Sequence, residues 1–219
     1  IYLNQERKLG FIMKVLHTKH IGITLVIFII LMLLVKLDFI LMIDEPIYNF
    51  VRLLHQVPFM DRFLIVYSNL FQPWHLVGFM AVILIILFFK NKKLSLITMT
   101  WAIVTLLLGI GLKYFIHRAR PVEYISGFSF PSLHTLTIVV AAVVFLTLMR
   151  KRYWHYIAYL MIFIMMVSRI YVHAHYFSDT VGAVLFGYLM LHVAQHFIAK
   201  YQLDVPFTSR LESPWQRDT

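Results

Sequence analysis

Long apolar stretches alternate with short polar connections along most of the chain. A helix needs roughly 20 mainly apolar residues to cross the hydrocarbon core of a bilayer. The pattern predicts six such helices, at residues 21–43, 73–89, 94–116, 132–149, 155–172 and 179–199. Lys36 and Asp38 interrupt the first helix, so they either face other helices or mark an earlier exit from the membrane. We therefore expect an all-α polytopic protein with six transmembrane helices.

The segment at residues 44–70, between the first two spans, mixes apolar and charged positions at helical spacing. This mixture is typical of an interfacial helical segment that lies on the membrane surface. An ordinary connecting loop is the alternative. We see no internal repeat, so we expect one membrane domain over residues 1–200. A flexible cytoplasmic tail at residues 201–219 would follow it.

Composition also favours a membrane protein. Hydrophobic residues make up 61% of the 219 positions, charged residues only 14%, and the mean hydropathy is +0.79. A water-soluble domain of this length carries a far larger charged share. The absence of cysteine excludes disulfides, thiolate metal sites and cysteine nucleophiles. No small-residue cleavage site follows the first apolar run, so we expect a retained helix rather than a signal peptide.

The net charge of +10 reflects membrane topology rather than nucleic-acid binding, because the basic residues occur in short runs between spans. With six spans, the basic runs near residues 7–19, 90–93, 150–152 and 200–217 all lie on one side. Lysine and arginine accumulate on the cytoplasmic side of membrane proteins. We therefore expect cytoplasmic termini in a plasma membrane, most simply a bacterial one, and no nucleic-acid partner.

Three polar clusters interrupt the apolar sequence: residues 113–121 (KYFIHRARP), residues 131–134 (PSLH) and residues 168–179 (SRIYVHAHYFSD). In the six-span topology all three lie at the extracytoplasmic ends of helices. Together they contain cations, histidines, a serine and an aspartate. This set of side chains can hold a phosphate and attack its phosphorus.

In the first cluster, Lys113 and Arg120 are seven residues apart, so they share a face if the helix continues that far. Pro121 marks the end of the helix. Lys113 lies deep enough to need a partner or a water-filled cavity. For Arg118, a lipid-facing position with its charge among the head groups is an equal alternative.

In the second cluster, Ser132 directly precedes an apolar run and is well placed to cap a helix. A helix start offers free backbone N–H groups and a positive dipole end, which together bind anions. His134 follows in the first turn. Taken alone, a capping serine beside an interfacial histidine is the simpler interpretation.

In the third cluster, His175 and Asp179 are four residues apart, so the carboxylate can reach the imidazole. A carboxylate on one ring nitrogen fixes the tautomer and leaves the other nitrogen free to attack. Arg169 offers a fork of donors suited to phosphate oxygens. His173 is two residues from His175, so we expect it to point elsewhere.

A zinc site is the rival interpretation, with His134, His173, His175 and Asp179 as ligands. The lysine and arginine residues in the same clusters disfavour a dication and favour a highly negative substrate. We therefore expect neither a metal nor a cofactor.

The three clusters, in this order, resemble the type 2 phosphatidic acid phosphatase family, which is related to the vanadium haloperoxidases. The family pattern is Lys, six residues, Arg-Pro; then Pro-Ser-Gly-His; then Ser-Arg, five residues, His, three residues, Asp. Residues 113–121 and 168–179 match their motifs in full. The middle motif departs at Leu133, where glycine is usual, although the sphingolipid-synthase branch of the family also carries leucine.

The resemblance implies a division of roles. His175 would be the nucleophile that forms a phosphohistidine, Asp179 would orient it, and His134 would be the general acid. The residues that would bind the phosphate are Lys113, Arg120, Ser132, Leu133 and Arg169. Leucine at position 133 keeps the backbone amide but would be strained if that position requires a positive φ.

We therefore expect a metal-independent lipid phosphatase with its site on the outer membrane face. Phosphatidate, phosphatidylglycerol phosphate and a polyprenyl pyrophosphate are candidate substrates. Leu133 keeps open a lipid phosphotransferase that passes the phospho group to a second lipid. A non-enzymatic lipid-phosphate binding or transport protein is a further alternative. The sequence determines neither the lipid nor the oligomeric state.

Overall fold

The computed structural model describes residues 21–149 and 151–201. Over these residues the chain forms helices and no strand, which confirms the all-α class. The tail predicted to be flexible and the first basic run lie outside the described residues.

A helix at Ile21–Lys36 comes first. The elements that follow it are α2 (Leu41–Arg52), the 3-10 turn η1 (Leu53–Gln56), α3 (Met60–Leu70), α4 (Pro73–Lys90), α5 (Lys92–Ile116), α6 (Leu133–Leu148), α7 (Tyr153–Tyr171) and α8 (Phe177–Lys200).

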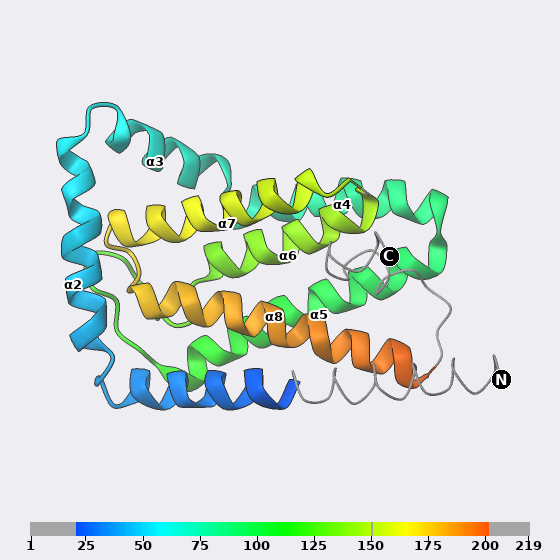
Figure 1. Ribbon diagram of the computed structural model, residues 1–219, viewed down its shortest axis with the longest axis horizontal. Coiled ribbons are helices and arrows are strands. Elements are labelled where there is room, and N and C mark those ends of the chain that lie inside the picture. Colours follow the sequence, from blue (N-terminus) through cyan, green and yellow to red (C-terminus); the bar gives the residue numbers. More distant parts are fainter. Residues whose placement is uncertain (1–20, 150, 202–219) are drawn as a thin grey trace.

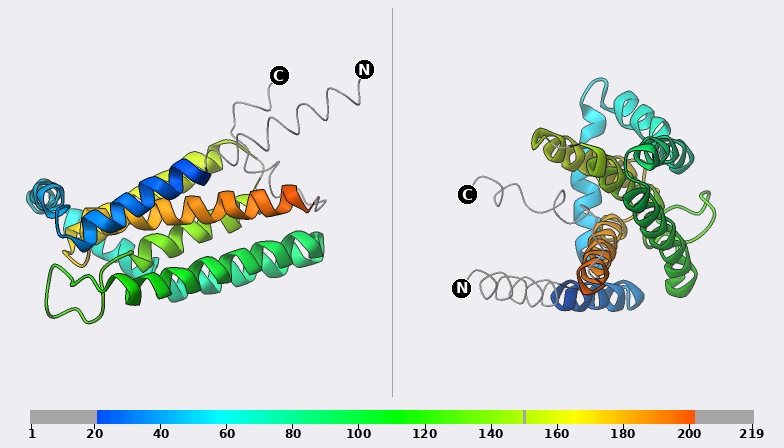
Figure 2. Two further views of the ribbon diagram at one scale, coloured as in Figure 1. Left: turned by 90° about the horizontal axis from the view of Figure 1, so that it is seen from below. Right: turned by 90° about the vertical axis from the view of Figure 1, so that its right-hand side faces the viewer.

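Helices α4 to α8 run side by side as a bundle, and α2 crosses one end of it (Figures 1 and 2). Helix α6 is central, since it packs against α4, α5, α7 and α8. Most of its 16 residues are buried. A helix packed against four others contacts mainly protein rather than lipid, which suits its short length.

Several helices are suited to crossing a membrane. Helices α4, α5, α7 and α8 are long and apolar enough, and α6 is a shorter apolar helix. The pair Ile21–Lys36 and Leu41–Gln56 would add a fifth span if it counts as one, but it bends by 87°. The described residues thus contain four or five candidate spans by length and composition. Six spans remain a prediction.

The first predicted span has a wrong boundary. The helix ends at Lys36, four turn residues follow, and α2 starts at Leu41 in a new direction, so the expected continuation to residue 43 does not occur. Asp38 adopts a left-handed backbone conformation with a φ of 56°. A helix cannot continue through that conformation, and aspartate is one of the residues that tolerate it.

The segment at residues 44–70 is helical, so the alternative of an ordinary loop is wrong. It comprises most of α2, then η1 and α3. Helix α2 contacts α7 and α8 at the end of the bundle. Its location on the membrane surface remains a prediction.

The outward faces of the long helices carry large apolar side chains. Ile85 and Phe89 of α4 are 58% and 84% exposed, and Leu107 of α5 is 62% exposed. An apolar surface of this extent is unfavourable in water but matches lipid tails. The outward faces therefore indicate an integral membrane protein.

Candidate active site

The three polar clusters come together at one end of the bundle. The chain connections explain why: α5 and α7 run toward this end, while α6 and α8 start from it (Figure 1). Lys113 lies in the last turn of α5 and Arg169 in the last turn of α7. His134 lies in the first turn of α6 and Asp179 in the first turn of α8. Four helix ends thus meet around His175, which lies between α7 and α8.

The imidazole of His175 lies beside the carboxylate of Asp179. The distance from His175 Nδ1 to Asp179 Oδ2 is 3.4 Å, and both side chains are almost fully buried. Asp179 Oδ2 also accepts a hydrogen bond of 2.9 Å from the backbone N–H of Tyr176. That bond is part of a capping box that starts α8 and fixes the carboxylate relative to the loop that carries His175.

The other ring nitrogen of His175 faces a cation. Its Nε2 lies 3.2 Å from Arg120 Nη1. The same guanidinium donates to the carbonyls of Ser126, Gly127 and Ala174 at 2.9–3.1 Å, which fixes its position. A nitrogen that would attack phosphorus is therefore adjacent to a donor that would bind a phosphate oxygen.

Burial determines the protonation state of His175. It lowers the pKa of His175 to about 4, with Asp179 acting in the opposite direction and Lys113 and Arg169 lowering it further. The imidazole is therefore uncharged at neutral pH and becomes protonated only as the pH falls toward that value. The uncharged form is the one that can act as a nucleophile.

Lys113 and Arg169 are cations whose hydrogen bonds go to neutral groups. Lys113 Nζ donates to the carbonyls of Phe128 and Ser129 at 2.6 and 3.2 Å. Arg169 Nη1 donates to Ser68 Oγ at 2.7 Å, and its buried Nε has no hydrogen-bond partner within the described residues. Across those residues neither side chain, nor that of Arg120, forms an ion pair with a carboxylate. Three cations around His175 thus remain uncompensated, as an anion site requires.

The start of α6 supplies the middle motif. Ser132 is its N-cap, since its Oγ accepts from the backbone N–H of Thr135 at 3.4 Å, and its own N–H donates to the Asp179 carbonyl at 3.1 Å. Leu133 is the first helical residue and has no positive φ, so leucine is not strained here. His134 is partly buried and within electrostatic range of Lys113, Arg169 and His175.

The lipid-facing interpretation of Arg118 is wrong. Its side chain is 4% exposed and lies between two buried carboxylates. Arg118 Nη2 donates to Asp44 Oδ2 and Nη1 donates to Asp179 Oδ1, both at 2.7 Å. The guanidinium also stacks over the Tyr176 ring, 4.0 Å from its centroid. An unpaired arginine in this position would extend to the lipid head groups. Arg118 stays buried because Asp44 and Asp179 neutralise its charge.

Asp44 and Ser178, two members of this network, were not identified as functional residues from the sequence. Asp44, on α2, accepts from Ser178 N at 2.8 Å and from Ser178 Oγ at 2.6 Å, and it is 1% exposed. In the sequence, the only indication of a role for Asp44 was its position beside an apolar run. Its partner Ser178 is 134 residues away along the chain. Through Arg118, Asp44 connects α2 to the carboxylate beside His175.

His173 points away from His175. Its ring stacks on that of Tyr48, with centroids 3.7 Å apart, and its backbone has a φ of 52°. His173 was one of the four candidate ligands of the rival zinc site, and its ring does not face His175. Within the described residues no group of three or more histidine, aspartate or glutamate side chains is arranged to hold a metal ion.

Family comparison identifies the chain. Residues 93–202, half of its length, match the PAP2 superfamily. The chain belongs to the PAP2 superfamily. All three polar clusters lie inside the matched region, whereas Asp44 lies outside it.

Two solved structures share the PAP2 fold of this chain. The first transmembrane PAP2 type phosphatidylglycerolphosphate phosphatase from Bacillus subtilis is 24% identical, with a TM-score of 0.71 over 84% of this chain and 98% of that one. LpxE of Aquifex aeolicus is 22% identical, with a TM-score of 0.55 over 73% of this chain and 95% of that one. Comparison with curated protein sequences gives no significant match. At these identities the likeness establishes the fold.

Proposed function

We propose that this protein is a membrane lipid phosphatase that works through a phosphohistidine. The observation that carries the proposal is the environment of His175. One ring nitrogen lies beside the Asp179 carboxylate and the other lies beside Arg120. Lys113 and Arg169 add further positive charge that no carboxylate of the described residues neutralises.

In the proposed first step, His175 Nε2 attacks the phosphorus and the bond from phosphorus to the lipid oxygen breaks. His134 donates a proton to that oxygen, so the lipid leaves as an alcohol or as a shorter phosphate. In the second step His134 takes a proton from water, which attacks the phosphohistidine and releases inorganic phosphate. The charges of Lys113, Arg120 and Arg169 would stabilise the transferring group, since phosphoryl transfer depends mainly on positioning and electrostatics. The amides at the start of α6, which Ser132 caps, would add donors.

The lipid class follows from where the site lies. It is at the end of a bundle whose outer faces are apolar, so a substrate with hydrocarbon tails can remain in the membrane while its phosphate reaches His175. Phosphatidate, phosphatidylglycerol phosphate and a polyprenyl pyrophosphate are the candidates, and the B. subtilis structural neighbour is described as a phosphatidylglycerolphosphate phosphatase.

The test is phosphate release by detergent-purified protein from each of these lipids in mixed micelles. We expect turnover to be unchanged by EDTA, because the proposed site binds phosphate with protein cations alone. Activity that disappears with EDTA and returns with one added metal would contradict the metal-independent mechanism. Absence of turnover on every lipid phosphate, with phosphate-specific binding intact, would instead support the non-enzymatic alternative.

A lipid phosphotransferase is the second candidate function, and Leu133 favours it. Glycine is usual at this position, and the leucine side chain lies at the start of α6 beside His134. A bulky apolar group there could place the hydroxyl of a second lipid near the phosphohistidine. Radiolabelled phosphate that moves to an added lipid alcohol, with little free phosphate, would separate transfer from hydrolysis.

We place the site on the extracytoplasmic face, because Lys90, Lys92, Lys93, Lys151 and Arg152 all lie at the opposite end of the bundle. The absence of native cysteine makes this testable without background. A cysteine at Tyr124, which is 82% exposed in the loop after α5, should react with a membrane-impermeant maleimide in intact cells. A cysteine at Lys92 should react only after lysis. The reverse pattern would invert the topology.

A further inference from the structure

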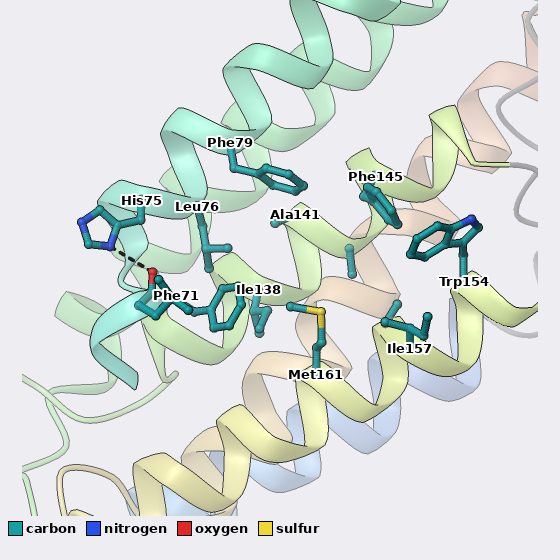
Figure 3. Close-up of a pocket in the computed structure, with 13 residues that line it drawn as sticks. Phe71, His75, Leu76, Phe79, Ile138, Ala141, Phe145, Trp154, Ile157 and Met161 are labelled. Carbon is teal, nitrogen blue, oxygen red and sulfur yellow. Dashed lines mark hydrogen bonds between the residues drawn. The ribbon is translucent and has the colours of Figure 1, made fainter. Parts of the chain in front are cut away.

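An apolar cavity lies between α4, α6 and α7 (Figure 3). Its volume is about 310 Å³, at the lower end of the range for small-molecule pockets, roughly 300–1,000 Å³. His75 contributes the polar side chain of the lining, and its Nδ1 donates to the Leu70 carbonyl at 3.0 Å. The described residues of the lining thus include no charged group to hold a phosphate or a head group, and they suit a hydrocarbon chain.

The α6 wall of the cavity continues directly to the candidate active site. It consists of Ile138, Ala141, Ala142 and Phe145. His134 is four residues before Ile138, and residues at this spacing share one helix face. The cavity wall and the proposed general acid therefore form one stripe along α6.

The α7 wall has the same relation to Arg169. It consists of Trp154, Ile157, Ala158 and Met161, again at helical spacing. The same face continues through Met165 to the last turn of α7, where Arg169 donates to Ser68 of α3. Leu70 and Phe71, which follow Ser68 closely, close the same end of the cavity. Two walls thus lead toward two groups of the phosphate site.

The shape of the cavity suits an extended chain. Alanines 141, 142 and 158 create the space, while the rings of Phe145 and Trp154 meet edge-on at the far end, with centroids 5.1 Å apart. The distance along α6 from Ile138 to Phe145 is about 10 Å at 1.5 Å per residue. Ile157 and Phe79 in the lining are 39% and 46% exposed, so the cavity opens toward the surrounding lipid.

We propose that this cavity binds one hydrocarbon chain of the substrate and that Phe145 and Trp154 limit its length. The inference rests on the proposed function, since it places the tail of the same lipid whose phosphate would reach His175. A chain that entered from the bilayer between α4 and α7 would run along the α6 stripe, with its polar end directed at His134.

The first experiment compares kcat/KM for dipalmitoyl and dihexanoyl phosphatidate in mixed micelles. Ala158→Leu and Ala142→Leu each fill part of the cavity. They should lower kcat/KM for the long-chain substrate by about tenfold, the scale on which an apolar pocket discriminates one or two methylene groups. The short-chain substrate should be little affected. Ala81→Leu, the same change on the exposed face of α4, is the control and should alter neither value. Equal loss on both substrates, or no loss on either, would overturn the proposal.

A second variant tests the opposite direction. Trp154→Ala removes the far wall, so activity on dipalmitoyl phosphatidate, whose chains are longer than the cavity, should rise relative to dihexanoyl phosphatidate. A fall in that ratio would contradict the proposed length limit.

A binding measurement separates this inference from the proposed function, because it needs no turnover. In His175→Asn protein, phosphatidate brominated along its acyl chain should quench Trp154 fluorescence more than brominated diacylglycerol does. Trp154→Phe should remove the difference. Equal quenching by both lipids would mean that any bilayer chain fills the cavity, and the tail assignment would fail even if the protein is a phosphatase. If the His175→Asn protein shows selective quenching but the wild-type protein releases phosphate from no substrate, the tail site is retained and the phosphatase proposal is rejected.

Discussion

His175→Asn is expected to abolish phosphate release, with kcat falling by about 10⁶-fold, the scale seen when a catalytic nucleophile is removed. His175 Nε2 lies 3.2 Å from Arg120 Nη1. Arg120 would therefore bind an oxygen of the phosphate that His175 attacks. Asparagine can donate its side-chain N–H to the Asp179 carboxylate in place of His175 Nδ1, but it has no nucleophilic nitrogen. Phosphate release from a lipid phosphate in mixed micelles measures the effect.

A neighbouring histidine provides a matched control. His173→Asn is the same chemical change two residues away, at a side chain that stacks on Tyr48 instead of facing the site. Asparagine tolerates the positive φ of 52° at this position, so the variant should fold and retain most activity. Covalent ³²P should be trapped by acid quench in wild-type protein and in the His173 variant, but not in the His175 variant. A His175→Asn protein that is active and carries covalent ³²P would contradict the assignment of His175 as the nucleophile.

Arg118→Gln is expected to cause the largest loss of stability. Arg118 hydrogen-bonds two carboxylates that are 0% exposed, those of Asp44 and Asp179. Removing one partner of a buried ion pair costs about 3–5 kcal/mol of unfolding free energy, because a buried charge is left uncompensated. Here two carboxylates would remain, so we expect a loss at the upper end of that range. Denaturation in mixed micelles would measure it.

Arg52→Gln is the control for this prediction, since it makes the same change at an exposed arginine of α2. It should change the unfolding free energy by less than about 0.5 kcal/mol. Asp44→Asn in the Arg118→Gln background removes one of the two like charges and should recover part of the loss. Additive effects of the two substitutions would show that Asp44 and Arg118 are not coupled.

The activity of these variants would report on positioning. Arg118 fixes Asp179, and Asp179 lies 3.4 Å from the His175 imidazole, but Arg118 is not among the cations that remain free for phosphate. We therefore expect the partly stabilised double variant to lose kcat more than it raises KM. Loss confined to KM would instead assign Arg118 to substrate binding.

Apolar periodicity predicted the helical class, which the structure confirms, and motif spacing predicted the residues of the proposed site. The expectation that the helix of Lys113 continues to Pro121 is wrong, because α5 ends at Ile116 and Arg120 lies in the loop that follows. The spacing of His175 and Asp179, four residues apart, already implied contact, because such a pair is adjacent around a helix start. The positions of Lys113, Ser132 and Arg169 next to apolar runs placed them at helix ends. Alternating spans then directed those ends to the same side.

The end of the first helix could not be located in this way. Its apolar residues continue past Lys36, but the chain turns at Asp38 and α2 crosses the end of the bundle. The turn depends on tertiary contacts, because it allows Asp44 on α2 to accept hydrogen bonds from Ser178 and Arg118. Hydropathy reports which residues avoid water, not which direction a helix takes.

What the sequence by itself determined about this protein is the set of chemical groups and the helix ends that carry them, since both depend on local spacing. Only the tertiary structure decided which cations stay free for a phosphate. Arg118 and Arg120 are two residues apart, yet among the described residues Arg118 pairs with two carboxylates and Arg120 with none. That difference arises because Asp44 reaches the site from α2, a contact across 74 residues of chain that no local pattern encodes.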